Sequence, residues 1–539
     1  MKSIKLISLT TALLLSSAAA QADVVISDKH TKNITCSVGA CVPDGPKAVL
    51  NVNDLVALLS TSDTTVFTGN GAVSISVEAP LSWTSSHKLT LNAYSSVYFK
   101  APVTAEGTAA VNIVTNTQGL GGEVYFRPGG SLSFWDTNSQ LTINGTAYTL
   151  FADLAVFADD VAANPAGNFA LAKDFDAFAD GIFPHSVVTT AFQGSLEGLG
   201  HTVDRLSIND SNPDDQLVGL FSRLEVASRV ANLHLTNASI TSNYASIGGI
   251  AGVGLGTIDH VWVGGSMKAG WYAAGIVGQN DGSINRAYSA VTLSGVVCGG
   301  ITGFNDGGVI SLSTASGSTI QCEAAGGFVG INQGNISLSS ASAAVSSNFD
   351  RAQIGGLVGE NAGRIDQSFA TGSVTQVKSQ NRRRYGSVSP ADLSARVGGL
   401  AGFSGGSITN SYSTGPISVL QSRRNAAGGL VGLYYSGSIG AAYSTGLVNA
   451  TSRSYLGGSI GYDERATRDK SSVYWDLDTS GVPDISKGAG NIAFDPGLKG
   501  ATDQHLKSGL PKGFDPKIWG SDPNINNGYP YLLANPPPK

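Results

Sequence analysis

A five-residue block of glycine and aliphatic residues recurs along the second half of the chain. Its eight copies occupy residues 248–252, 274–278, 299–303, 326–330, 355–359, 398–402, 428–432 and 457–461. Their starts lie 25 to 30 residues apart, except for one step of 43 that holds an insertion around Arg382 to Arg396. A fixed period in this range is typical of solenoids, propellers and other repeat arrays.

Other positions repeat in phase with this block. Six residues after the start of the block, four consecutive copies carry an asparagine: Asn280, Asn305, Asn332 and Asn361. An aliphatic residue follows four positions later, and the runs between Gly and Asn are short and rich in β-branched and small side chains. Such runs predict short strands joined by turns, because none is long enough for a helix.

These features predict a β-solenoid whose coils contain about 25–30 residues. Equivalent residues of successive coils would stack about 4.8 Å apart, so the asparagines would form a hydrogen-bonded ladder at one turn. A propeller is the alternative architecture, but its units are about 40–50 residues long. We therefore expect an all-β protein, a parallel β-helix (β-solenoid) with an irregular C-terminal cap.

The pattern changes along the chain and divides it into five expected segments. Residues 148–180 have an apolar spacing that suits one short helix, and the regular block is lost after about residue 465. The segments are a signal peptide (1–22), an N-terminal β-rich or β-helical region (23–147), a connecting segment with a short helix (148–215), the β-helix repeats (216–465) and a C-terminal capping region (466–539).

The first 22 residues have the features of a secretory signal peptide. Lys2 and Lys5 precede a short apolar stretch, and a small-x-small cleavage site ends at Ala22. The apolar stretch is too short to span a bilayer, and no later segment is long enough. We therefore expect export and no transmembrane span.

Export would place the four cysteines in an oxidising compartment, where disulfides form. Cys298 and Cys322 stand about one coil apart, so stacking would bring their backbones within disulfide range. We predict a Cys298–Cys322 bond between neighbouring coils and a Cys36–Cys41 bond that closes a small loop near the N-terminus. The alternative is that the cysteines remain buried thiols.

The amino-acid composition excludes several classes of protein. Charged residues make up only 13% of the chain and glycine supplies 69 of 539 residues, which excludes a coiled coil and a charge-driven disordered tail. The net charge of −6 is thinly spread, so the overall field gives no reason to expect a nucleic-acid partner.

Few groups of residues point to catalysis or metal binding. Ser459 lies in a Gly-x-Ser-x-Gly pattern, but this is a degenerate copy of the repeat. Asp281 and Asp306 would stand in neighbouring coils, at a spacing close to that of the two carboxyl groups of a retaining glycosidase, yet both occupy Asn-Asp-Gly turns. The segment 476–481 begins like a calcium loop, but Lys487 replaces the acid at position twelve. We expect no catalytic residue, no metal and no cofactor.

Aromatic residues share one phase of the repeat. Tyr288, Phe369, Tyr412 and Tyr443 follow their blocks at equivalent positions, so we expect them to stack on one face. Such a row is either an interior ladder that fills the core or an exposed stripe on which sugar rings pack. Buried rings would indicate the interior ladder, and exposed rings the sugar-binding stripe.

Basic residues gather in one stretch of the chain. Residues 378–468 contain ten basic and three acidic side chains, a local net charge of +7. Arg351, Arg424 and Arg453 each lie four residues before a block, so stacking would align them along one edge. This edge is either a solvated turn that discourages sheet association or a site for an anionic polymer. The candidate binding residues are Arg382, Arg383, Arg384, Arg423, Arg424 and Arg453.

The repeat also resembles a known family. The units of the form Gly-Gly-Leu-Val-Gly-x-Asn-x-Gly-x-Ile are similar to the GLUG repeats of bacterial filamentous haemagglutinin-like adhesins. Further segments that resemble these proteins are 89–93, 141–150, 192–201 and the closing 526–532. The resemblance implies a right-handed parallel β-helix displayed outside the cell.

We therefore expect an exported adhesin-like protein, secreted, on the cell surface at the outer membrane, or in the periplasm. It would bind glycans, matrix or other cells by many weak contacts along a stiff rod. Its expected partners are an extracellular glycan or anionic polysaccharide, a host or neighbouring cell surface, and further copies of itself. The alternatives are a polysaccharide lyase or hydrolase built on a β-helix and a homotypic structural protein of a biofilm matrix.

Overall fold

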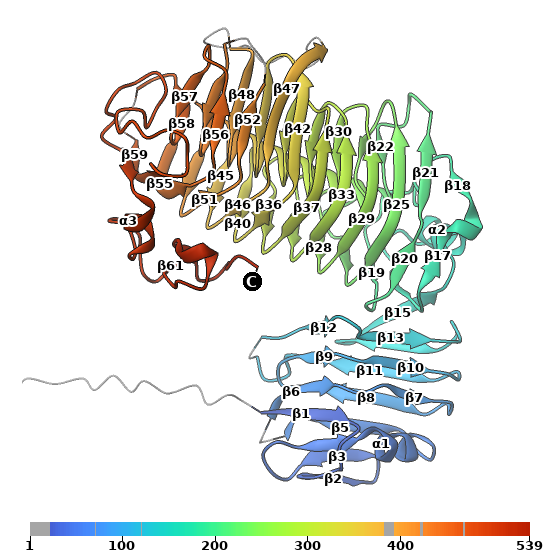
Figure 1. Ribbon diagram of the computed structural model, residues 1–539. Coiled ribbons are helices and arrows are strands. Elements are labelled where there is room, and N and C mark those ends of the chain that lie inside the picture. The colour runs from blue at the N-terminus through green and yellow to red at the C-terminus, as the bar shows by residue number, and fades with distance from the viewer. Residues whose placement is uncertain are drawn as a thin grey trace, which may run out of the picture. The chain divides into compact units, whose positions relative to one another are not determined.

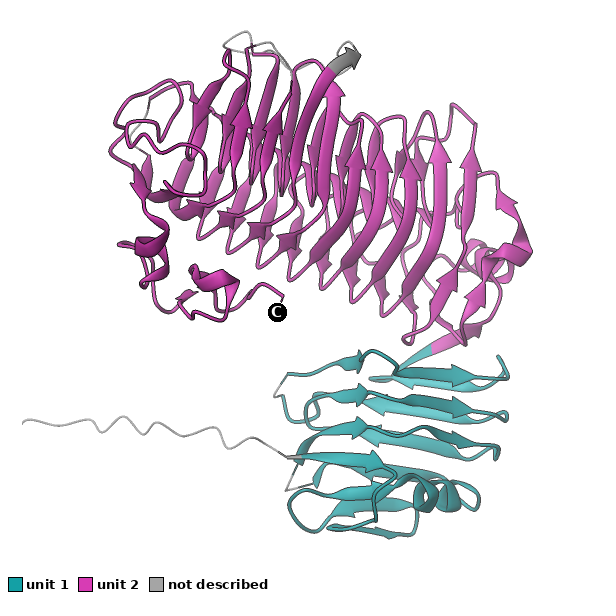
Figure 2. Ribbon diagram, viewed as in Figure 1, with its two compact units in different colours: residues 1–147 teal, residues 148–539 magenta. Residues whose placement is uncertain are grey.

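The structure, a computed structural model, describes residues 22–69, 72–119, 121–381, 393–420, 424–466 and 469–538. The chain forms two compact units, Met1–Ala147 and Tyr148–Lys539 (Figure 2). Strands account for 49% of the residues and helices for 6%, and the parallel coils make about 16 turns in total. The expected β-solenoid is confirmed. The signal-peptide prediction concerns residues that, apart from Ala22, lie outside the described ranges.

In its described residues, the first unit contains parallel arrays of short strands and the α-helix α1 (Val52–Leu59). Asn51 caps this helix by accepting the Asn53 N–H, while Leu55 and Leu59 are buried beneath it. The hairpin of β2 (Ile34–Ser37) and β3 (Ala40–Pro43) is antiparallel. The arrays are β12 (Val124–Phe126), β9 (Val97–Phe99), β6 (Ala72–Val77), β1 (Ala22–Ser27) and β4 (Val49–Asn51); β13 (Ser131–Phe134), β10 (Pro102–Ala105) and β7 (Leu81–Trp83); and β3, β5 (Thr64–Phe67), β8 (Lys88–Asn92), β11 (Ala110–Val114) and β14 (Gln140–Ile143).

The second unit begins within β15 (Thr146–Phe151), passes through helix α2 (Leu154–Ala163) and continues as regular coils (Figure 1). Asp153 caps α2 by accepting the Val156 N–H, and Leu154, Phe157 and Val161 are buried. One coil consists of β30 (Tyr272–Ala274), β31 (Val277–Asn280), β32 (Ser283–Asn285) and β33 (Tyr288–Ser294). The five-residue block therefore forms the corner between the first two strands of each coil.

Each strand pairs with its equivalent in the next coil, which builds long parallel sheets. We call the sheet before the corner sheet 1 and the sheet after it sheet 2. Sheet 1 contains β22 (Leu217–Val218), β26 (Ser246–Ile247), β30, β34 (Val297–Gly299), β38 (Ala324–Gly326), β43 (Ala352–Gly355), β48 (Ala395–Gly398), β53 (Ala426–Gly428) and β57 (Tyr455–Gly457). Sheet 2 contains β23 (Phe221–Leu224), β27 (Ala251–Gly254), β31, β35 (Thr302–Asn305), β39 (Val329–Asn332), β44 (Val358–Asn361), β49 (Ala401–Ser404), β54 (Val431–Tyr434) and β58 (Ile460–Asp463).

The glycine that ends each block allows the two corner sheets to approach closely. A Cβ atom on Gly402 would lie 2.4 Å from the backbone nitrogen of Ile354 and 2.8 Å from the carbonyl oxygen of Gly359, both in the preceding coil. Such distances are shorter than van der Waals contact, so only glycine fits. The aliphatic residues of the block, such as Leu400, point into the core and are fully buried.

The asparagine ladder is present and lies inside the coils. The Asn280, Asn305 and Asn332 amides each donate a hydrogen bond of 2.8 Å to the side-chain oxygen of the next asparagine, ending at Asn361. All four residues are buried. The ladder satisfies the polar groups of the turns within the core, as the phase of the asparagines predicts.

Replacing one ladder residue should weaken the stack. In Asn332→Ala the Asn361 oxygen loses its donor, and the Asn305 amide keeps only its bond to the Gly308 carbonyl. We expect a loss of about 2–3 kcal/mol in unfolding free energy, because buried polar groups lose their partners. Asn335→Ala, at an exposed position of the same coil, is the control. Thermal unfolding by circular dichroism measures both, and equal melting temperatures would contradict a stabilising ladder.

In the coils after Asn361, other residues occupy the ladder position, and the last of them forms a buried ion pair. Asn361, Ser404, Tyr434 and Asp463 are paired in register in successive coils. The Lys470 ammonium, in β59 (Lys470–Asp476), lies 2.8 Å from the Asp463 carboxylate and 3.3 Å from that of Asp495. Its Nζ atom also lies 5.0 Å from the centre of the Tyr434 ring. Charge thus replaces the amide ladder where the repeat ends.

Both predicted disulfides are confirmed. Cys298 and Cys322 are bonded with a Cα–Cα distance of 6.0 Å and connect neighbouring coils of sheet 1. Cys36 and Cys41 are bonded across the hairpin of β2 and β3, where they face each other in register. Among the described residues no cysteine is free.

The aromatic row is neither an interior ladder nor an exposed stripe, the two arrangements that the sequence predicts. Phe369, Tyr412 and Tyr443 stack with ring centres 4.8 and 4.9 Å apart and are all buried. Ser413 and Ser444 follow these tyrosines in the same strands, and their hydroxyls hydrogen-bond to carbonyls of the glycine corner inside the coil. Since successive side chains of a strand point to opposite faces, the aromatic rings point out of the coil. Tyr288 lies in the same register farther along the sheet, but it is only half-buried.

The C-terminal segment covers this outward-facing row. It begins after β60 (Leu498–Ala501), which pairs with β59, and returns along the coils (Figure 1). Trp519 packs 6.0–6.1 Å from the rings of Tyr412 and Tyr443, and the Tyr443 hydroxyl donates to the Pro530 carbonyl at 2.7 Å. The segment comprises α3 (Asp503–Lys507), β61 (Trp519–Gly520), η3 (Asn526–Gly528) and β62 (Tyr531–Leu532). Burial raises the pKa of the Tyr443 hydroxyl well above its usual range.

Candidate functional site

Outward-facing side chains of sheets 1 and 2 meet along the corner. They stand two residues before the start of each block and five residues after it, so residues such as Tyr455 and Tyr462 flank the glycines from both sides. In the earlier coils, Tyr272 and Phe304 stack here with ring centres 5.6 Å apart. We call this line the outer seam. Its side chains form small apolar clusters separate from the core.

The last coils of the seam combine aromatic rings with arginines. The Arg424 guanidinium lies 5.7 Å from the centre of the Tyr455 ring, and that ring meets Tyr462 edge-on at 4.8 Å. The Arg465 guanidinium lies 4.3 Å from the centre of the Tyr435 ring and donates to the Tyr435 hydroxyl at 2.7 Å. We call these five residues the arginine–tyrosine cluster.

Burial beneath the cluster holds its rings in place. Leu393, Ala426 and Leu433 are buried under it, and Phe403 stacks on Tyr435 with ring centres 6.0 Å apart. The three tyrosines are half-buried, whereas both arginines are exposed. The cluster therefore presents supported aromatic rings together with solvent-exposed cations.

Charge around the cluster is predominantly positive. Arg453 is exposed and lies one coil from Arg424, at the equivalent turn before sheet 1. Glu464 is the neighbouring acid, and burial followed by the Glu464 charge raises the pKa of the Tyr462 hydroxyl. The phenol is therefore neutral at physiological pH and can both donate and accept hydrogen bonds.

Two of the six arginines predicted to bind a ligand lie within the described residues. Arg424 and Arg453 are exposed on turns that precede sheet 1. Arg396, one of the basic residues counted in the sequence, is buried and adds nothing to the exposed charge. The other predicted residues, Arg382, Arg383, Arg384 and Arg423, lie outside the described ranges.

The aromatic half of the cluster was not among the residues predicted to bind a ligand. Tyr455 and Tyr462 occupy repeat positions that also hold Tyr272 and Phe304 in earlier coils, so their phase was visible in the sequence. Tyr435 and Arg465 have no such phase, because each lies in a turn after a strand of sheet 2.

The candidate catalytic and calcium-binding residues occupy positions that serve the fold. Ser459 is fully buried at the corner, where no substrate reaches it. Asp281 and Asp306 are exposed in their turns, and their backbone N–H groups donate to carbonyls of the preceding coil. Asp476 accepts the N–H groups of Asp478 and Thr479 and the Tyr529 hydroxyl, so its carboxylate anchors the C-terminal segment.

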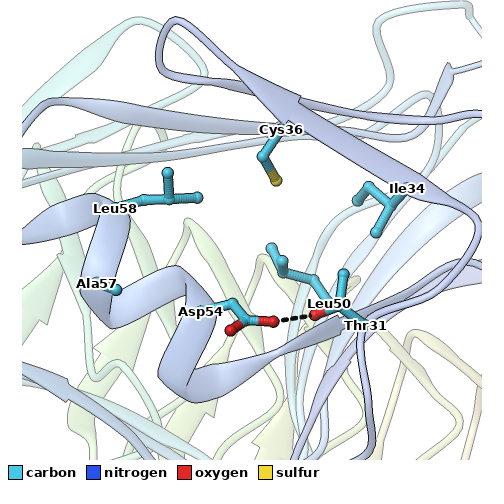
Figure 3. A pocket seen from close by; sticks show the side chains of 7 residues that line it. All are labelled: Thr31, Ile34, Cys36, Leu50, Asp54, Ala57 and Leu58. Atoms are coloured by element: carbon cyan, nitrogen blue, oxygen red, sulfur yellow. Dashed lines mark hydrogen bonds between the residues drawn. The ribbon is translucent and has the colours of Figure 1, made fainter.

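The first unit contains a separate apolar pocket of about 340 Å³ (Figure 3). Side chains from the β2 hairpin and α1 point into it, and the Thr31 hydroxyl donates to the Asp54 carboxylate at its edge. The lining residues are Thr31, Ile34, Cys36, Leu50, Asp54, Ala57 and Leu58. The pocket suits a small apolar group better than a charged polymer.

Comparison with known proteins supports the repeat assignment. The GLUG motif family matches residues 350–375 and 394–419, which contain two of the corner blocks. The chain is also similar to halomucin of Haloquadratum walsbyi (strain DSM 16790 / HBSQ001), at 28% identity over 320 residues. This alignment covers 56% of the chain but only 3% of halomucin. Within the described ranges, no helix is both long and apolar enough to cross a membrane. The chain is thus a parallel β-solenoid that carries GLUG motifs.

Proposed function

We propose that this chain is an exported adhesin-like β-solenoid, secreted or held at the cell surface, that binds an anionic extracellular polysaccharide. The arginine–tyrosine cluster is the observation that carries the proposal. The similarity to halomucin, the GLUG motifs and the N-terminal signal-peptide pattern support a location outside the cell.

The chemistry of the cluster suits a charged sugar chain. Arginine pairs bidentately with carboxylate and sulfate groups and keeps its charge at all physiological pH values. Half-buried tyrosine rings offer flat apolar faces to the C–H faces of pyranose rings, and their hydroxyls offer hydrogen bonds. Arg424 and Arg465 are exposed beside different rings, so the cluster can contact more than one sugar unit.

Repetition along the solenoid would add to the affinity. Arg424 and Arg453 stand one coil apart, and a polymer held at one point meets the next at a high effective concentration. Weak contacts at several coils would then combine into firm attachment to a matrix or a neighbouring cell.

Polymer binding to the wild-type protein and to the double variant Arg424→Ser/Arg465→Ser tests this proposal. Dextran sulfate and polygalacturonate are suitable anionic probes, with dextran as the neutral comparison. We expect the variant to bind at least tenfold more weakly, and wild-type binding to weaken as salt rises beyond about 0.15 M, because exposed charges are screened within about 8 Å.

Arg364→Ser is the matched control, because Arg364 is exposed but forms its ion pair with Asp366 away from the cluster. Unchanged affinity in the double variant, or binding that does not respond to salt, would contradict the proposal. Release of new reducing ends from polygalacturonate would instead indicate a polysaccharide-cleaving enzyme.

A further inference from the structure

A second cavity lies between the coils and the C-terminal segment, away from the outer seam. It has a volume of about 310 Å³, near the lower end of the range for small-molecule sites. Its lining residues are Thr414, Thr445, Thr479, Asn526, Asn527 and Tyr529. None of these side chains is charged at neutral pH, so the cavity offers hydroxyl and amide groups and one aromatic ring.

Threonines from successive coils form one wall. Tyr412 pairs with Tyr443 and Ser413 with Ser444, which places Thr414 and Thr445 next in the same register. The Thr479 hydroxyl donates to the Thr445 carbonyl at 2.7 Å and so joins the row. Within the described part of the chain, the Thr414 and Thr445 hydroxyls form no hydrogen bond. Their spacing of about 4.8 Å is close to that of hydroxyl groups on alternate carbons of a pyranose ring.

The opposite wall is held rigidly by the aromatic row. The Asn526 amide donates to the Tyr443 hydroxyl at 2.7 Å and to the Pro530 carbonyl at 2.8 Å. The Tyr529 hydroxyl lies within hydrogen-bond distance of the carboxylates of Asp476 and Asp503, which share its one proton. Asn527 adopts a left-handed backbone conformation (φ 55°) and is exposed at the cavity, and its amide has no hydrogen bond in the described structure. The wall is therefore preorganised, with an amide left to bind a ligand.

We propose that this cavity binds one neutral pyranose unit of a glycan. Sugar hydroxyls need groups that both donate and accept, and the threonine hydroxyls and the Asn527 amide do both. None of the lining side chains carries a charge that could pair with an acidic sugar. The nearby Lys507 ammonium is already paired with the Asp503 carboxylate at 2.9 Å. The site thus complements the arginine–tyrosine cluster, because one would bind a neutral sugar and the other an anionic one.

Saturation-transfer NMR with methyl glycosides of glucose, galactose and mannose, and with glucuronate, tests the site. We expect transfer to at least one neutral glycoside and none to glucuronate. Thr445→Val keeps the side-chain shape but removes the hydroxyl, and we expect it to weaken binding of that glycoside at least fivefold. Asn527→Gly, which keeps the left-handed backbone accessible, should do the same.

The matched control is Thr371→Val. Thr371 precedes Thr414 in the same register but does not line the cavity. It should bind the glycoside like the wild type, and circular dichroism checks that all variants fold. Absence of transfer to all three neutral glycosides would overturn the inference, as would full binding by Thr445→Val. Neither result affects polymer binding by the arginine–tyrosine cluster, so the two proposals fail separately.

Discussion

Gly402→Ala should lower the free energy of unfolding by about 3 kcal/mol or more. The added methyl group would overlap backbone atoms of Ile354, Gln353 and Gly359, at distances from 2.4 to 2.8 Å. No change of rotamer relieves a clash with backbone, so the two corner sheets must move apart, and strand pairing on both sides weakens. Hydrogen exchange should increase in β43 and β49 first.

Gly405→Ala is a matched control three residues away. Its Cβ would meet nothing closer than 3.5 Å, where the nearest atom belongs to the Phe403 side chain. We expect a change within about 1 kcal/mol, because the loss of backbone freedom in the unfolded chain slightly favours alanine. Similar melting temperatures for the two variants in differential scanning calorimetry would show that close packing at the corner does not stabilise the fold.

Lys470→Met should destabilise the end of the solenoid by about 3–5 kcal/mol. The side chains of Lys470 and Asp463 are fully buried, and removing the ammonium would leave the carboxylates of Asp463 and Asp495 without their cation. A buried charge that loses its partner costs more than the pair itself contributes. Urea unfolding, followed by near-ultraviolet circular dichroism of the surrounding aromatic residues, measures the loss.

Two further variants separate charge from packing. Lys499→Met, at an exposed position over Tyr474, should change stability little. Adding Asp463→Asn to Lys470→Met should recover part of the loss, because it removes one unpaired charge. A double variant that is no more stable than the single one would indicate that the lysine acts through packing alone.

The same site should be insensitive to pH over the physiological range. Burial by itself lowers the pKa of Lys470, but the hydrogen bond to Asp463 and the attraction of the nearby carboxylates outweigh it, so the pKa lies above its ordinary value of 10.5. The contribution of this lysine to stability is therefore complete below pH 10.5 and is lost only as the pH rises through the higher folded-state value.

Contacts between neighbouring coils were predictable from the sequence. Each coil touches chiefly the coils before and after it, so residues in one repeat phase must meet. The ladder from Asn280 to Asn361 and the Cys298–Cys322 bond both follow from phase alone. The phase of Tyr412 and Tyr443 likewise predicts that they stack, and they do.

Contacts that cross this repeat order were decided by the tertiary structure. Trp519 donates to the side chain of Asn410, 109 residues earlier, and no repeat relates the two positions. The aromatic row is therefore buried by a returning C-terminal segment rather than by the core, which its phase could not reveal. The arginine–tyrosine cluster likewise joins turn residues such as Arg465 to strand residues on two sheets. A periodic sequence determines which residues stack along the axis, because stacking repeats every coil. Only the folded chain determines what packs across the outside of the coils, because those contacts occur once.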